Sequence, residues 1–238
     1  MTPHSPVRSA VTPRPVETEA GAPFPRHATG VVMRTEERLV DRILPVYDVS
    51  DAVATVVDAD LAHTWDALME VDLVEVGRQR PIVAALGALR IVPELVTRLL
   101  HGEAPPPGPR RLRLRDTTTL PQDQGGWILL GERPRDEIAL GLVGRFWRPV
   151  IVYAQVTPEA FRTFDEPGYA KTIYSLSVRA LDERRTLLSG VMRTATTDEH
   201  ARRWFRRYWT LGIGSGAHVL VNGLLDVTRE LAEDREGR

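Results

Sequence analysis

The chain has 238 residues, a formal net charge of -1, 42% hydrophobic residues, 26% charged residues and no cysteine. This length and composition predict one soluble folded domain, or at most two small ones. The missing cysteines exclude disulfides, thiolate nucleophiles and cysteine metal sites. The near-neutral charge gives no global reason to bind nucleic acid, so we expect no nucleic-acid partner.

Residues 1–45 are predicted to form a disordered, proline-rich tail with a short helix near its end. The first residues lack the apolar run of a signal peptide, so a cytoplasmic location is the expectation. Residues 208–225 carry no charge, but their four glycines, one histidine and one asparagine fit a buried helix better than a membrane span. We therefore expect no transmembrane segment.

Residues 46–234 are predicted to form the folded domain. Alternating residues predict a first strand over residues 49–57, and Asp60 is a suitable N-cap for the helix that follows. Pro81 stands where a second helix would begin. Beyond a proline-rich loop, leucines alternate with arginines over residues 111–115, which predicts a half-buried strand.

The second half of the chain is dominated by strand patterns and ends in a helix. Further strands are predicted over residues 127–132, 137–146, 149–153, 169–181 and 185–197. The last two form a hairpin, and a long aromatic-rich helix begins near Asp198. Helices interrupt the strands only once, so the predicted class is α+β with an antiparallel sheet, and a βαβ repeat is excluded.

This order of elements and several local sequences resemble the START-like, helix-grip superfamily, also called SRPBCC or polyketide cyclase/dehydrase and lipid-transport proteins. The similarity is to its uncharacterised bacterial members and covers about residues 47–233. The local matches are VDAD at 57–60, TWDAL at 64–68, GRFW at 144–147, Phe161 with Phe164, EPGY at 166–169 and RWFRRYW at 203–209.

The resemblance implies a curved antiparallel sheet of about seven strands that wraps around the C-terminal helix and leaves a cavity between them. It also implies two short helices after the first strand. Members of the superfamily bind lipids, sterols, plant hormones or polyketides, and some are cyclases or aromatases. Arg193 lies where many relatives carry an arginine, but the glutamate that often precedes it is absent from residues 189–192.

The final helix carries the candidate pocket residues. At helical spacing one stripe contains Trp204, Tyr208, Leu211, Ser215 and His218, which combine apolar bodies with polar tips. A ligand pocket needs such a wall, mostly apolar with a few placed polar groups. The alternative is that Trp204 and Tyr208 are ordinary core or rim aromatics.

His218 is the best candidate for a general base, because the pKa range of histidine suits proton transfer. No Asp or Glu lies within one helical turn of it, so a partner would have to come from the sheet. Arg145 and Arg193 are the candidates for orienting a ligand or stabilising an oxyanion. The alternative for His218 is a buried, hydrogen-bonded structural histidine.

No metal or cofactor is expected. The six histidines are dispersed without ligand spacing, and the glycine-rich residues 212–216 follow a helix and not a strand, which excludes the Walker and Rossmann contexts. Arginines at 202, 203, 206 and 207 flank aromatic residues. Such a basic and aromatic pattern can bind single-stranded nucleic acid or an anionic membrane surface. The simpler interpretation is a solvated face balanced by neighbouring acids such as Asp198 and Glu199.

Three functions stay open at this point. The first is binding of a small hydrophobic or amphipathic molecule, lipid-like or polyketide-like, between the sheet and the last helix. The second is a cyclase, aromatase or dehydratase on the same scaffold, and the third is an interaction module without a functional cavity. A cavity where His218 meets a sheet carboxylate or arginine favours the enzyme, and a cavity with only apolar lining favours binding. A last helix packed tightly on the sheet without a pocket favours the interaction module.

Overall fold

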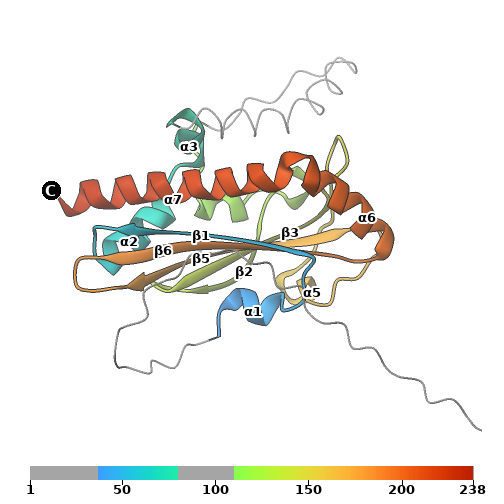
Figure 1. Ribbon diagram of the computed structural model, residues 1–238, viewed down its shortest axis with the longest axis horizontal. Helices are drawn as coiled ribbons and strands as arrows, with labels where there is room; N and C mark the ends of the chain where they lie inside the picture. Colours follow the sequence, from blue (N-terminus) through green and yellow to red (C-terminus); the bar gives the residue numbers. More distant parts are fainter. Residues whose placement is uncertain (1–36, 80–109, 238) are drawn as a thin grey trace, which may run out of the picture. The chain divides into compact units, whose positions relative to one another are not determined.

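The computed structural model describes residues 37–79 and 110–237, and for residues 212–215 it describes the backbone alone. The predicted disordered tail, up to residue 36, and the helix expected from Pro81 lie outside the described residues. Within them, the class is α+β, as predicted (Figure 1).

The described part of the chain contains one six-stranded antiparallel sheet, where about seven strands were expected (Figure 1). The strands are β1 (Val49–Val57), β2 (Ile128–Arg133), β3 (Glu137–Arg145), β4 (Val152–Tyr153), β5 (Ala170–Ala180) and β6 (Thr186–Thr196). Their order is β1-β6-β5-β3-β2, and the short β4 pairs with β3. The first strand of the chain therefore lies beside the last one.

The strand predicted over residues 111–115 is wrong. This segment makes a single bridge, between Arg113 and Asp72, and then enters the 3-10 helix η1 (Arg115–Thr118). Asp116 turns the chain there, because its carboxylate accepts a hydrogen bond from the Arg113 amide at 3.0 Å.

The helices lie between and after the strands. They are α1 (Leu39–Ile43), α2 (Leu61–Glu70), α3 (Leu73–Gln79), the short η2 (Gln122–Gln124), α5 (Pro158–Phe161), α6 (Glu199–Tyr208), the π-helical turn η3 (Trp209–Ile213) and α7 (Gly214–Glu236). Among residues 37–79 and 110–237, no helix combines the length and apolar character that crossing a membrane requires.

Two aspartates begin helices as N-caps. Asp60 accepts a hydrogen bond from the His63 amide at the start of α2, which confirms its predicted role. Asp198 does the same for α6 through the Ala201 amide. The single long helix expected after Asp198 is divided, because η3 separates α6 from α7.

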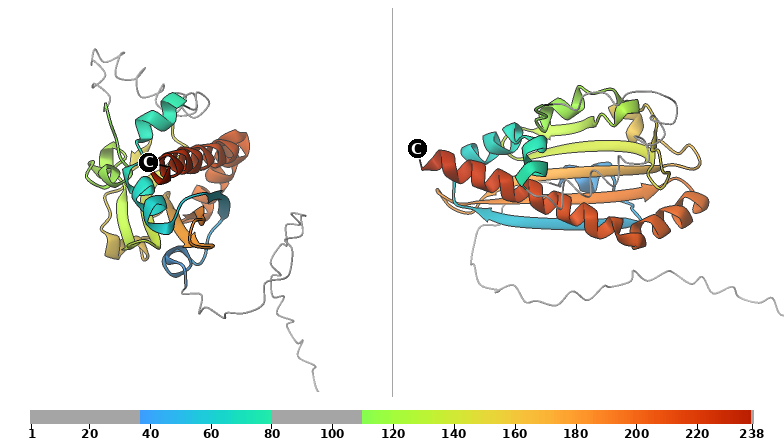
Figure 2. Two further views of the ribbon diagram at one scale, coloured as in Figure 1. Left: turned by 90° about the vertical axis from the view of Figure 1, so that its left-hand side faces the viewer. Right: turned by 90° about the horizontal axis from the view of Figure 1, so that it is seen from above.

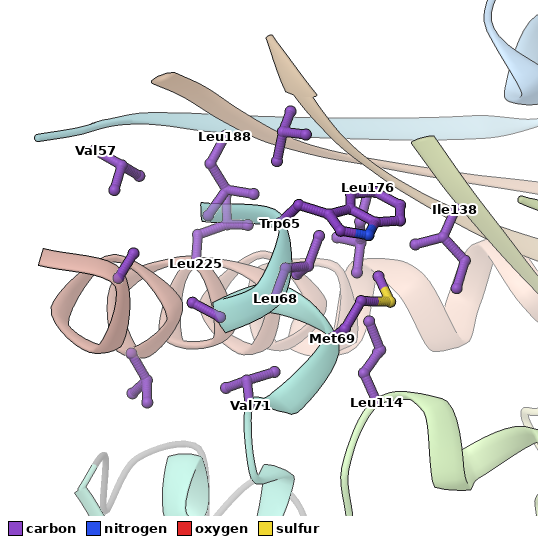
Figure 3. Close-up of a cluster of buried hydrophobic side chains, with 14 of the residues drawn as sticks. Val57, Trp65, Leu68, Met69, Val71, Leu114, Ile138, Leu176, Leu188 and Leu225 are labelled. Atoms are coloured by element: carbon purple, nitrogen blue, oxygen red, sulfur yellow. The ribbon is translucent and has the colours of Figure 1, made fainter. Parts of the chain in front are cut away.

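The sheet is covered on both sides (Figure 2). We call the side of the sheet on which α2 and α7 pack the helix face, and the side on which α1 and α5 pack the back face. Trp65, Leu68 and Met69 of α2 pack on the helix face with Leu225 of α7 (Figure 3). Burial of this cluster, at about 25 cal/mol per Å² of apolar surface, is the main force that holds α2 and α7 to the sheet.

A glycine in β6 allows α7 to approach the sheet closely. A Cβ placed on Gly190 would lie 2.7 Å from Cγ1 of Val221 in α7, closer than two such carbons come in folded proteins. Gly190 therefore sets the distance between α7 and this part of the helix face.

A buried carboxylate joins α1 to the back face. The side chain of Glu137 is 1% exposed. It accepts hydrogen bonds from the Leu39 amide at 2.8 Å, from the Arg133 guanidinium and from the Ser175 hydroxyl. Leu39 is the first residue of α1, and its amide has no partner within the helix. The carboxylate supplies that partner and is itself fully satisfied.

Candidate functional site

A cavity of about 250 Å³ lies on the helix face, between the sheet and α7. Its aliphatic walls come from α3, β3, β5 and α7. They are formed by Leu73, Val76, Leu140, Leu176, Leu220, Val221 and Leu224. The connection that precedes β2 contributes Leu114, Thr117 and Trp127 to the lining. Tyr174 of β5 completes the lining.

Strand alternation explains which sheet residues reach this cavity. Tyr174 and Leu176 are two apart in β5, so both side chains lie on the same face, while Ser175 between them points to Glu137 on the back face. Leu140 is paired with Tyr174 in the neighbouring strand and therefore lies beside it. The cavity floor is thus a direct consequence of the strand pattern.

Asp72 fixes the rim of the cavity. Its carboxylate accepts hydrogen bonds from the amides of Val74 and Leu112, both at 3.0 Å. The Leu73 amide donates to the Leu112 carbonyl at 2.8 Å. These bonds fasten the beginning of α3 to the connection that carries Leu114. Two rim segments about 40 residues apart in sequence are held together in this way.

Among the residues that the structure describes, two hydroxyl groups line the cavity, and that of Thr117 is already used, because it donates to the Leu114 carbonyl at 2.6 Å. The other belongs to Tyr174. Its ring meets Trp127 edge to face, with centroids 5.0 Å apart at 78°. Burial raises the pKa of its hydroxyl above the ordinary value, and nearby Tyr208 and Asp51 raise the pKa further. The hydroxyl is therefore neutral at physiological pH. It has no hydrogen-bond partner among residues 37–79 and 110–237, so it is available to a ligand.

One row of paired residues crosses the helix face: Asp51, Met192, Tyr174 and Leu140. The row begins with a carboxylate on β1 and ends with a leucine in the cavity. The row therefore carries two polar side chains, Asp51 at one end and Tyr174 beside the cavity, with the buried Met192 between them.

His218 meets a carboxylate from the sheet. Its Nδ1 lies 2.9 and 3.1 Å from the two carboxylate oxygens of Asp51, and the His218 side chain is 47% exposed. An Nδ1–H that donates to a carboxylate leaves Nε2 with a free lone pair, the arrangement of a general base with its orienting acid. His218 does not line the 250 Å³ cavity, although it lies on the same side of the sheet.

The other residues expected on the helix stripe are spread around α6 and η3. Trp204 is 45% exposed and Leu211 is 84% exposed, so both side chains meet solvent. Tyr208 is close enough to Tyr174 to raise the pKa of the Tyr174 hydroxyl. Ser215 is the second residue of α7, and its side chain lies outside the described part of the chain. None of these residues lines this cavity.

Arg145 and Arg193 both lie on the back face, away from α7. Arg145 stacks over the Tyr169 ring with its guanidinium carbon 4.4 Å from the centroid. Arg193 pairs with Asp41 at 2.6 Å and donates to the carbonyls of Val40 in α1 and of Leu44 just after it. The sheet stands between these arginines and the cavity, so the structure does not bring either one together with His218.

Asp60, His63 and Glu236 place three potential metal-ligand atoms within 4.8 Å of one another. The His63 Nδ1 lies 3.0 Å from a carboxylate oxygen of each acid. Asp60 is already used as the N-cap of α2. These contacts describe an exposed ion-pair triad that ties the start of α2 to the end of α7.

Asp51, Tyr174 and Trp127 are site residues that the sequence analysis did not select. The alternation of β5 carried the information for Tyr174, since it shares a face with Leu176. No comparable pattern exists for Asp51, whose partner is 167 residues away in sequence. No protein-family model matches the chain, and no curated protein shows significant similarity to it.

Proposed function

We propose that this protein binds a small, mainly apolar molecule that carries one polar group, lipid-like or polyketide-like, between the sheet and α7. We also propose that the sheet and its C-terminal helix form a helix-grip fold, as the sequence resemblance implies. The observation that carries the functional proposal is the 250 Å³ apolar cavity lined by Tyr174, whose hydroxyl has no hydrogen-bond partner in the described part of the chain.

The composition of the cavity gives each part of the ligand a role. Leucine, valine and tryptophan side chains favour an apolar body, because burying it removes apolar surface from water at about 25 cal/mol per Å². A carbonyl or hydroxyl on the ligand satisfies the Tyr174 hydroxyl, and this fixes the orientation. The volume is at or below the lower end of the usual range for ligand pockets, which favours a compact molecule.

A dye titration tests this proposal. The neutral dye phenylnaphthylamine should bind the protein with enhanced fluorescence, and Leu220→Trp should weaken that binding at least about tenfold by filling the cavity. Leu181→Trp is the matched control, because Leu181 is also a partly exposed leucine but lies in the β5–β6 turn. Equal dye binding by the wild type and Leu220→Trp would rule out this cavity as the binding site.

The Asp51–His218 pair favours a second candidate, an enzyme of the cyclase, aromatase or dehydratase type with His218 as the general base. Short poly-β-ketone thioesters, followed by liquid chromatography and mass spectrometry, provide the test. His218→Asn should slow conversion at least about a hundredfold, and Asp51→Asn should slow it through loss of the orienting acid. Identical conversion with and without protein would eliminate this candidate.

A further inference from the structure

An exposed basic and apolar surface occupies the outer side of α6 and the π-helical turn after it. We call it the arginine elbow and define it as Arg203, Trp204, Arg206, Arg207 and Leu211. Residues 203 and 207 are four apart in α6, which places them along one side of that helix, and Leu211 follows in the π-helical turn η3. Ala201 and Phe205 point the other way and are buried, so they anchor the elbow to the protein.

The positive charge of the elbow is not neutralised locally. Arg203 and Arg206 have no carboxylate partner among residues 37–79 and 110–237. The acids that could have balanced them have other partners. Glu199 pairs with Arg202 at 2.7 Å, and Asp198 caps α6. Arg203 and Arg206 are thus exposed to solvent without an ion-pair partner in the described part of the chain, and this leaves their charge available to an anionic partner.

Large apolar side chains stand exposed beside these charges. Leu211 is 84% exposed, and Trp204 is 45% exposed with the Arg207 guanidinium carbon 5.3 Å from its ring centroid. Exposed apolar residues next to unpaired charge indicate a surface that contacts something else. A helix with arginines on its polar side and Trp or Leu beside them is typical of segments that lie in a membrane interface.

We propose that the arginine elbow docks this protein on the surface of an anionic lipid bilayer. Arg203 and Arg206 bind the phosphate and carboxylate headgroups, Trp204 lies at headgroup depth, and Leu211 enters the boundary of the acyl chains. Single-stranded nucleic acid fits less well. Its bases stack on aromatic rings, and Leu211, the more exposed of the two apolar members of the elbow, offers no ring.

Vesicle co-sedimentation of the full chain tests the proposal. The wild type should sediment with vesicles of phosphatidylcholine and phosphatidylserine and stay in solution with phosphatidylcholine alone. The double variant R203E/R206E should bind the anionic vesicles at least about tenfold more weakly. Leu211→Ser should weaken binding while keeping its dependence on salt concentration.

The matched control is R179E/R184E, which makes the same change of charge at exposed positions near the β5–β6 turn, at the other end of β6 from α6 (Figure 1). It should bind like the wild type, and thermal melts should show that all variants are folded. Three results would overturn the proposal: no binding of the wild type to anionic vesicles, an equal loss in R179E/R184E, or tighter binding to a single-stranded oligonucleotide than to the vesicles. None of these results depends on the cavity.

Discussion

Replacing Glu137 by Gln should destabilise the protein by about 3 kcal/mol. The carboxylate accepts three hydrogen bonds in a buried position, from the Leu39 amide, Arg133 and Ser175. A hydrogen bond to a charged group contributes roughly 1.5–3 kcal/mol, and one between neutral groups roughly 0.5–1.5 kcal/mol. The loss is thus about 1 kcal/mol for each of the three bonds. For a domain of this size it corresponds to a fall in Tm of roughly 6–12 °C.

Urea denaturation followed by circular dichroism measures this change, and hydrogen exchange at the Leu39 amide locates it. We expect the Leu39 amide to lose protection in Glu137→Gln, because the carboxylate is its partner. Glu132→Gln is the control, since Glu132 makes only a long 3.4 Å contact with the exposed Arg115 and should change stability by less than about 0.5 kcal/mol. A free energy of unfolding for Glu137→Gln within about 0.5 kcal/mol of the wild type would refute the reasoning.

Three further predictions follow from other contacts. Gly190→Ala should lower the free energy of unfolding in urea by about 1–3 kcal/mol, because the new methyl group would lie 2.7 Å from Val221. The double variant with Val221→Ala should lose less stability than the two single variants added together. A loss equal to that sum would contradict the contact. Asp198→Ala should cost about 1–2 kcal/mol at neutral pH. The hydrogen bond from the Ala201 amide is the main cause that lowers the pKa of Asp198 in the folded protein. The stabilisation by Asp198 is therefore complete above the ordinary carboxyl pKa and disappears as the pH falls through the lowered pKa. A loss of stability in Asp198→Ala that stays constant into strong acid would count against this account. Tyr174→Phe should weaken binding of a naphthol about tenfold while leaving naphthalene unchanged, as measured by fluorescence titration, and an equal effect on both would show that the hydroxyl does not contact the ligand.

Local physical rules predicted a large part of the fold. Strand alternation identified β1, β2, β3, β5 and β6. Asp60 and Asp198 marked the positions where α2 and α6 begin. These features depend on residues a few positions apart, so a single sequence contains them.

Long-range contacts account for what the sequence did not predict. The strand expected over residues 111–115 failed because Asp72, 40 residues earlier, takes the Leu112 amide as a partner. The helical spacing used to predict one stripe of residues does not hold through Trp209–Ile213, because a π-helical turn adds a residue to the helical repeat. The expected stripe therefore places Leu211 in solvent, while Leu220, Val221 and Leu224 reach the cavity.

The sequence identified His218 but not its environment. The sequence indicated that any acidic partner of His218 would have to come from the sheet, and Asp51 of β1 is that partner, with its Oδ2 2.9 Å from Nδ1 of His218. Strand pairing brings Asp51 and Tyr174 to opposite sides of Met192, and no local pattern predicts that neighbourhood. The polar end of the site is therefore a property of the assembled sheet.

Native mass spectrometry of the purified protein, followed by denaturing extraction of whatever is bound, tests the central claim most directly. The account predicts an added mass in the wild type that extraction identifies as a compact, mainly apolar molecule with one polar group, and a strongly reduced added mass in Leu220→Trp. A wild type that carries no added mass and shows no thermal shift with a panel of lipids and polyketides would contradict the binding function.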